Sequence, residues 1–281
     1  MPDPIVQTDG LWFWYSEGAP VVKGVDLMIG AGEFVALVGA NGSGKTTLVK
    51  HFNGLLRPRR GQVQVAGQDA AGRSMGELAR QVGYLFQRPE QQIFSPTVQQ
   101  ELAFGPRNLG LPQAEIKARV EAALARFRLA AVAGQPPAIL SYGLRRRVTL
   151  ASLAAMDPPV LVLDEPTVGL DARGLEETFD WLAGLHAQGR TIVLVTHDMV
   201  LAAARAGRVI VLGQGEVIAD GPPDQVFRQN ELLTRAALVP PPVTALAQAL
   251  RPYGMRGDSL TVEAFCDEYV ALMEKGHEPA L

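Results

Sequence analysis

The sequence predicts an α/β fold in which a parallel β-sheet is covered by helices on both faces. Five short apolar runs recur along the chain without alternating polar and apolar residues: Phe34–Val38, Tyr84–Phe86, Val160–Leu163, Thr191–Val195 and Val209–Leu212. Strands that are apolar on both faces are typical of a buried parallel sheet. A glycine-rich stretch follows the first run and opens a helix-like segment, Thr46–Leu56. This order of strand, loop and helix is the context of a phosphate-binding loop.

Three further parts complete the predicted architecture. Residues 1–31 combine aromatic and apolar residues with turn-forming breaks, which predicts a small antiparallel sheet beside the first parallel strands. Between Gln87 and Met156 the pattern becomes helical, because Ile116, Val120, Leu124 and Phe127 are spaced for one helix face. After residue 227, a triple proline and two short apolar stripes predict a C-terminal extension over residues 228–281.

Charge and composition restrict the possible partners. The net charge of −3 over 281 residues argues against nucleic acid as the main partner, because phosphate backbones require a strongly basic face. Two local basic runs, Arg57–Arg60 and Arg145–Arg147, are expected to be solvated or helix-capping faces. No apolar run approaches the length of a membrane span, and the N-terminus lacks the charged and apolar regions of a signal peptide. We therefore expect any membrane association to occur through a partner.

The single cysteine excludes a disulfide framework and suits a reducing cytoplasm. Cys266 belongs to a helical apolar stripe that also contains Val262, Phe265, Tyr269, Val270 and Met273. We expect this cysteine to pack in the core rather than to react.

The segment Gly39–Thr46 reads G-x-x-x-x-G-K-T. Its glycines allow backbone angles that bring successive N–H groups onto phosphate oxygens. Lys45 would reach the β- and γ-phosphates, and the Thr46 hydroxyl would contact Mg²⁺. A chance glycine turn before a helix is the alternative, but the preceding strand and following helix favour nucleotide binding. The predicted ATP-binding residues of this segment are Gly39, Asn41, Gly42, Ser43, Gly44, Lys45, Thr46 and Thr47.

Two carboxylates end the apolar strand before Pro166. Adjacent acids are tolerated in a buried strand only at its end, where they leave the core. Asp164 is predicted to hold Mg²⁺, and Glu165 to activate or orient the attacking water. A strand-terminating turn with solvated acids is the alternative.

Two polar residues follow neighbouring strands. His197 ends the strand Thr191–Thr196, so it can face the same γ-phosphate as Asp164 and contact the water or Glu165, although a lone histidine is more often structural. Gln87 closes the strand Gly83–Phe86, where its amide could join the shell of Mg²⁺ and water; an ordinary polar strand end is the alternative. No chemical role is expected for the other histidines: His51, His186 and His277.

Residues 1–227 resemble the ATP-binding-cassette (ABC) ATPase family. The resemblance is carried by the P-loop, Gln87, Leu140–Arg145, Asp164-Glu165, Gly169–Asp171 and His197, in this order. It implies a RecA-like P-loop NTPase core with an antiparallel β subdomain and a helical subdomain at about 88–156. It also implies that Tyr15 stacks on adenine, the alternative being a core aromatic residue.

The family's mechanism implies two cassettes in a head-to-tail sandwich, as a homodimer or a heterodimer. Ser141 and Gly143 would contact the γ-phosphate held by the partner's P-loop, and Asp171, in the D-loop, would connect the two sites. The usual signature L-S-G-G-Q is altered here, because Tyr142 replaces a glycine and Leu144 the glutamine. The site that this signature completes is therefore expected to be weaker or more dependent on one partner.

Within the family, Phe86–Phe94 and Ala103–Gly110 are similar to the ATPases of energy-coupling factor importers. These take up B vitamins or nickel and cobalt ions with a transmembrane scaffold protein and a substrate-binding membrane protein. The resemblance implies a place at the cytoplasmic face of the membrane. It also implies that residues 87–106 lie beside the scaffold and that 228–281 help to hold the ATPase pair.

Three alternatives to this assignment remain. The chain could be a low-turnover regulatory half of a heterodimer, as the altered signature suggests, or the ATPase of another ABC transporter type. Soluble chromosome-maintenance or translation ATPases of the superfamily fit poorly, because neither coiled-coil arms nor a second cassette is visible in the sequence.

Overall fold

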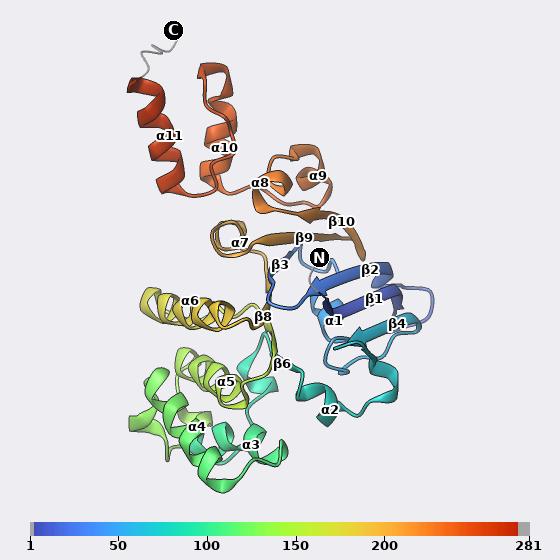
Figure 1. Cartoon of the computed structure of the whole chain (residues 1–281), viewed down its shortest axis with the longest axis vertical. Helices are drawn as coiled ribbons and strands as arrows, with labels where there is room; N and C mark the ends of the chain where they lie inside the picture. Colours follow the sequence, from blue (N-terminus) through green and yellow to red (C-terminus); the bar gives the residue numbers. More distant parts are fainter. Residues whose placement is uncertain (1–2, 275–281) are drawn as a thin grey trace.

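The computed structural model describes residues 3–274 and confirms the predicted α/β fold. Its central sheet has six strands in the order β10-β9-β3-β8-β7-β6 (Figure 1). All neighbours are parallel except β10, which pairs antiparallel with β9. Each predicted apolar run coincides with one of its strands. The strands are β3 (Phe34–Val38), β6 (Val82–Leu85), β7 (Val160–Asp164), β8 (Thr191–Thr196), β9 (Arg208–Gly213) and β10 (Glu216–Gly221).

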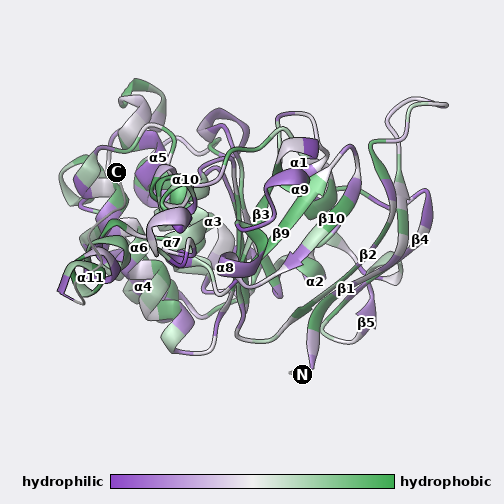
Figure 2. Ribbon diagram, turned by 90° about the horizontal axis from the view of Figure 1, so that it is seen from above, coloured by the Kyte–Doolittle hydropathy of each residue, from purple (hydrophilic) through white to green (hydrophobic). Residues whose placement is uncertain are grey.

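A second sheet is antiparallel, with the order β2-β1-β4-β5. The predicted N-terminal strands form β1 (Pro4–Phe13) and β2 (Val22–Gly30), while β4 (Arg60–Val65) and β5 (Gln68–Asp69) come from beyond the predicted segment. Figure 2 shows this sheet on one side of the central strands and most helices on the other.

The two faces of the central sheet build two separate cores. Along β3, Phe34, Ala36 and Val38 point toward the helices, whereas Val35 and Leu37 point toward the antiparallel sheet. Both faces are buried, which explains the continuous apolar runs. The first core contains α3 (Val98–Asn108), α4 (Gln113–Arg126), α5 (Tyr142–Met156), α6 (Ala172–Ala187) and α7 (Met199–Arg205). The second contains residues of α1 (Lys45–Val49) and α2 (Met75–Ala79).

The periodicity predicted for α4 is confirmed, whereas the helix after the P-loop differs in length from the prediction. In α4, Ile116, Val120 and Leu124 are buried, and Phe127 follows them into the core as expected. The helix after the P-loop is shorter than predicted, because it ends at Val49 and continues as turns through residue 56.

The C-terminal part contains α8 (Pro223–Val226), α9 (Asn230–Arg235), α10 (Pro242–Ala249) and α11 (Val262–Glu274). Figure 1 shows α10 and α11 at the end of the molecule, beyond β9 and β10. Among the described residues, no helix is long and apolar enough to cross a membrane. His277 lies outside the described residues.

The expected burial of Cys266 is wrong, because its side chain is exposed. The half-buried face of α11 is formed by Phe265, Glu268 and Leu272, which are spaced by three and four residues. This rotation turns most of the predicted apolar stripe outward. Its exposed large members are Val262, Tyr269, Val270 and Met273.

Candidate functional site

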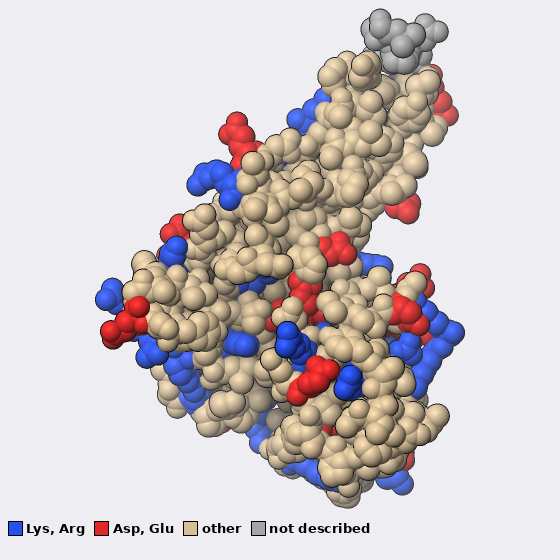
Figure 3. Space-filling view, turned by 180° about the vertical axis from the view of Figure 1, so that it is seen from behind, with Lys and Arg blue, Asp and Glu red and all other residues tan. Residues whose placement is uncertain are grey.

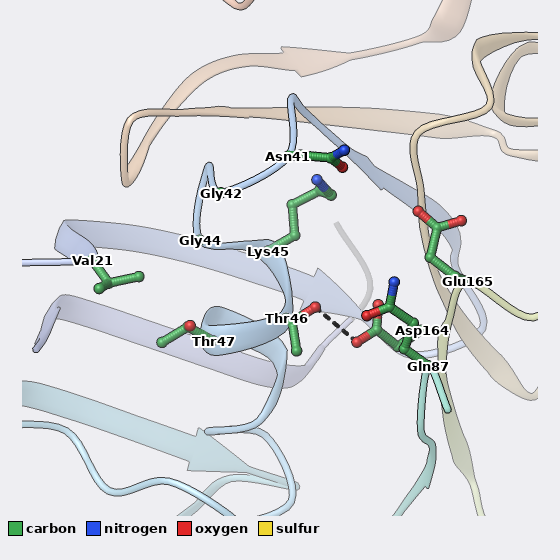
Figure 4. A pocket seen from close by; sticks show the side chains of 10 residues that line it. All are labelled: Val21, Asn41, Gly42, Gly44, Lys45, Thr46, Thr47, Gln87, Asp164 and Glu165. Atoms are coloured by element: carbon green, nitrogen blue, oxygen red, sulfur yellow. Dashed lines mark hydrogen bonds between the residues drawn. The ribbon is translucent and has the colours of Figure 1, made fainter. Parts of the chain in front are cut away.

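The P-loop connects β3 to α1 and forms one wall of a pocket (Figure 4). Gly42 and Gly44 have φ values of 80° and 104°, which are strained for residues with a Cβ atom. A Cβ atom on Gly44 would also lie 2.7 Å from the carbonyl oxygen of Val21. Gly44 is thus required both by its positive φ and by its close approach to the Val21 carbonyl.

Lys45 folds back over this loop. Its Nζ donates hydrogen bonds to the carbonyl oxygens of Gly39 and Ala40 at 2.8 and 3.0 Å. Burial lowers the pKa of Lys45, and the negative charges of Glu165 and Asp164 oppose this effect. The ammonium group is therefore a buried cation at a pocket wall, where an anionic phosphate would stabilise it.

Ser43 provides an independent indication of an anionic ligand. Its hydroxyl oxygen is buried and has no hydrogen-bond partner within the part of the chain that the structure describes. Buried polar groups normally have partners, so an unpartnered hydroxyl in a loop of this kind indicates a ligand atom. Phosphate oxygens of ATP fit this donor.

Asp164 lies at the end of β7, opposite the P-loop. Its Oδ2 accepts hydrogen bonds from the Thr46 hydroxyl at 2.8 Å and from the Tyr84 hydroxyl at 3.1 Å. Burial raises the pKa of Asp164, and these two hydrogen bonds oppose that effect. Figure 4 shows Gln87 beside this carboxylate. Thr46, Gln87 and Asp164 line the pocket, whereas Tyr84 does not.

The donor set suits Mg²⁺ bound together with a nucleotide. Within residues 3–274, no cluster of three or more His, Cys, Asp or Glu side chains could hold a metal alone. Mg²⁺ usually binds through one or two carboxylates, several waters and the phosphates of its substrate. Thr46, Asp164 and Gln87 provide a hydroxyl, a carboxylate and an amide oxygen at one place.

Glu165 and His197 form a close pair at the same end of the sheet. The Oε1 of Glu165 lies 2.6 Å from Nδ1 of His197 and 3.1 Å from its backbone nitrogen. Glu165 has a φ of 49°, an uncommon value for a residue other than glycine, and is buried. Such strain at a buried carboxylate that lines a pocket is typical of a functional position.

The residue predicted to stack on adenine, Tyr15, lies next to Thr47, which lines the pocket. The hydroxyl of Tyr15 is 3.3 Å from that of Thr47, and its ring packs edge-on against Phe13. Tyr15 is 59% exposed, so it is not the core aromatic residue of the alternative interpretation.

The signature residues lie elsewhere and do not line this pocket. Ser141 caps the N-terminus of α5 by accepting a hydrogen bond from the Leu144 N–H. Gly143 packs against the carbonyl of Gly169, where a Cβ atom would come within 2.8 Å. Asp171 caps α6 and lies 3.3 Å from the Arg147 guanidinium. The chain alone thus does not bring its signature to its own P-loop.

The expectation that Arg145–Arg147 form a solvated or capping face is wrong for Arg146, which is fully buried. Its guanidinium donates to the carbonyls of Phe86, Gln87, Glu165 and Val168. The five N–H donors of an arginine can satisfy several backbone acceptors at once, which makes this burial possible. The helical spacing of Arg146 from the buried Leu150 and Leu153 is the sequence signal that could have revealed it.

The comparison with protein families decides the assignment. Residues 22–168 match the family model described as ABC transporter. The chain belongs to the ABC transporter family. It is 41% identical to the energy-coupling factor transporter ATP-binding protein EcfA of Methanocaldococcus jannaschii, over 92% of both chains. It is 42% identical to a putative ABC transporter ATP-binding protein of Methanosarcina acetivorans, but spans only 41% of that longer relative.

Solved structures support the same assignment. CbiO1 of Clostridium perfringens, part of the transporter complex cbiONQ, has a TM-score of 0.71 and 36% identity over 83% of this chain and 94% of its own. A dimeric ATP-binding cassette in a post-hydrolysis state, bound to ADP and Pi, has a TM-score of 0.69 and 28% identity, over 77% and 98% of the two chains. The predicted family, fold class and enzyme class are confirmed: the protein is an ABC-type ATPase of the energy-coupling factor kind.

Proposed function

We propose that this ATPase drives an energy-coupling factor importer, through ATP-dependent closure of two cassettes that moves a membrane partner. The observation that carries the proposal is the convergence of Lys45, Thr46, Asp164 and the buried Glu165 at one pocket, with the exposed His197 hydrogen-bonded to Glu165. These groups come from different segments of the chain, so their meeting at one pocket is a property of the fold.

Catalysis would consist mainly of positioning and electrostatic stabilisation, as in other phosphoryl-transfer enzymes. The P-loop N–H groups and Lys45 would hold the phosphates, while Thr46, Asp164 and Gln87 would hold Mg²⁺. When bound, Mg²⁺ would neutralise charge that develops on the phosphate oxygens. Glu165 would accept a proton from, or orient, the attacking water.

His197 would hold Glu165 in place and contact the γ-phosphate. Because a carboxylate only accepts, the 2.6 Å contact means that Nδ1 donates to Glu165 whenever that acid is ionised. The ring would donate to a phosphate through Nε2 only in its doubly protonated form.

The signature residues Ser141, which is exposed, and Gly143, which is half-buried, would complete the P-loop site of a second cassette. The test is the molar mass of Glu165→Gln protein measured by light scattering with and without MgATP. A doubling with MgATP would show that this chain forms its own pair. A protein that binds ATP but remains a monomer would place the complementary signature on a paralogue, and the pair would then be a heterodimer.

A regulatory, low-turnover role is the second candidate, because Tyr142 and Leu144 alter the signature. The intact Glu165–His197 pair argues against this role for the site on the chain's own P-loop. Mutating the catalytic glutamate separately in each subunit of a mixed complex discriminates between the two. An unchanged rate after Glu165→Gln in this chain would favour the regulatory role.

An exposed aromatic patch supports the assignment of a membrane partner. Phe94 and Phe104 are 64% and 42% exposed, with ring centroids 4.4 Å apart. The buried carboxylate of Glu101 accepts hydrogen bonds from the N–H groups of Phe94 and Ser95, which fixes the loop that presents the patch. The scaffold protein would dock here, and the ATPase would lie at the cytoplasmic face of the membrane.

The cargo would be a micronutrient, either a B vitamin or a cobalt or nickel ion, selected by a separate substrate-binding membrane protein. The exposed apolar face of α11 supports a role for residues 228–281 in holding the ATPase pair. In the view from behind, Figure 3 shows mainly uncharged side chains over the upper part of the molecule, with a few charged ones at its edges. Uptake of labelled cobalt or vitamin by the reconstituted complex, with Phe94→Asp as the docking variant, tests cargo and docking together.

A further inference from the structure

Tyr84 is a buried side chain of β6 for which the nucleotide site has not yet provided a role. It is 7% exposed and lies on the strand at the edge of the central sheet. Its register partner on β7 is Val162, two residues before Asp164. Side chains two residues apart point to the same face of a strand, so Tyr84, Val162 and Asp164 share one face.

That face is the one that α1 covers. The core on this side contains Tyr84, Val160 and Val162 together with Leu48 and Val49 of α1. Thr46 therefore reaches Asp164 from α1, and the Tyr84 hydroxyl reaches it from the neighbouring strand β6. The ring spans the distance to the end of β7, which an aliphatic side chain would fill without providing a donor.

Both hydroxyl groups donate to the same oxygen of Asp164. The distances to Oδ2 are 2.8 Å from Thr46 and 3.1 Å from Tyr84. A carboxylate oxygen has two lone pairs, so these donors occupy the hydrogen-bonding capacity of Oδ2. No residue between 3 and 274 donates a hydrogen bond to Oδ1.

We propose that Tyr84 is a positioning residue for the magnesium site, which fixes the Asp164 carboxylate so that Oδ1 remains available to the metal ion and its waters. The proposal rests on the proposed MgATP site. Hydrogen bonds to a ligating carboxylate restrict its rotation, and removing such an outer partner typically weakens metal binding by about 10- to 100-fold. Tyr84 contacts neither nucleotide nor metal in this role.

The test removes only the hydroxyl, with Tyr84→Phe. Tyr253→Phe is the matched control, because it deletes the same atom from an exposed ring in the C-terminal extension. For each protein, Mn²⁺ binding to the ATP complex is titrated by electron paramagnetic resonance. ATP binding is measured separately by calorimetry in EDTA.

We expect about tenfold weaker Mn²⁺ binding in Tyr84→Phe, unchanged ATP binding in EDTA and no change in the control. Metal affinity within about twofold of the unmodified protein would overturn the proposal, as would equal losses with and without metal. Tyr84→Leu, which also lacks the ring, should lose the same metal affinity as Tyr84→Phe. A loss seen only in Tyr84→Leu would assign the effect to ring packing and overturn the proposal. If the unmodified protein bound ATP neither in EDTA nor with Mg²⁺, the nucleotide site itself would be refuted instead.

Discussion

Replacing Arg146 with methionine should strongly destabilise the protein. The side chain is fully buried. Its guanidinium donates hydrogen bonds to the carbonyls of Phe86 and Gln87 in one loop and of Glu165 and Val168 in another. Methionine has a similar length but donates no hydrogen bond. Arg146→Met therefore removes the connection between the loop that carries Gln87 and the loop that carries Glu165.

The magnitude follows from the acceptors left behind. A hydrogen bond from a charged donor contributes about 1.5–3 kcal/mol, and a buried acceptor that loses its partner costs about 1–3 kcal/mol. These terms do not add fully, because some of the four carbonyls will rotate toward water, and the arginine's own desolvation is recovered. We expect a loss of about 3–5 kcal/mol in the free energy of unfolding, a large part of the total of a typical domain.

The assay is urea unfolding followed by circular dichroism, with ATPase activity measured in parallel. Arg173→Met is the control, because its side chain is 66% exposed and pairs with Glu177, four residues along the same helix. That substitution should change the free energy of unfolding by less than about 0.5 kcal/mol. A loss below about 1 kcal/mol for Arg146→Met, or a loss equal to that of the control, would refute the reasoning.

Three further predictions concern other parts of the chain. Burial lowers the pKa of His51 below 6.5, so the unfolded chain binds a proton more readily than the folded protein. The free energy of unfolding should therefore fall as the pH drops below 6.5. In urea unfolding measured between about pH 5 and 8, His51→Leu should flatten this fall. Gly44→Ala should abolish ATP binding measured by calorimetry, because its Cβ atom would lie 2.7 Å from the Val21 carbonyl; binding as tight as in the unmodified protein would contradict the described loop path. Arg208→Met should cost about 1–2 kcal/mol in urea unfolding, since it removes ion pairs to Glu33 and Asp220 at 2.9 and 2.6 Å; no change would show that these pairs are fully screened.

The central sheet could be predicted because its strands are buried on both faces, which leaves continuous apolar runs such as Phe34–Val38. The antiparallel sheet was predicted only in part. Its strand β4 begins at Arg60, and its first three residues are exposed, so the segment has no continuous apolar pattern. The orientation of α11 was also not predictable from periodicity, because an apolar stripe does not reveal whether a neighbour covers it.

The pocket residues could be predicted because their spacing is local: the P-loop is one segment, and Asp164 and Glu165 end one strand. Tyr84 and Arg146 were missed for the opposite reason. Each acts on the site through a long side chain that reaches a different segment, and Arg146 is 60 residues away from Phe86 in the sequence. A basic run suggests solvent exposure, and only the fold reveals which arginine of the run points inward.

Because the apolar stripe of α11 faces outward, the helix presents one native position at which a reporter group can be attached. Cys266 is the only cysteine of the chain, and its thiol is exposed on the helix at the end of the molecule. A maleimide dye or nitroxide would therefore label one defined position without any engineered substitution. Energy transfer or dipolar coupling between two labelled copies would then follow the distance between their C-terminal extensions through each round of nucleotide addition.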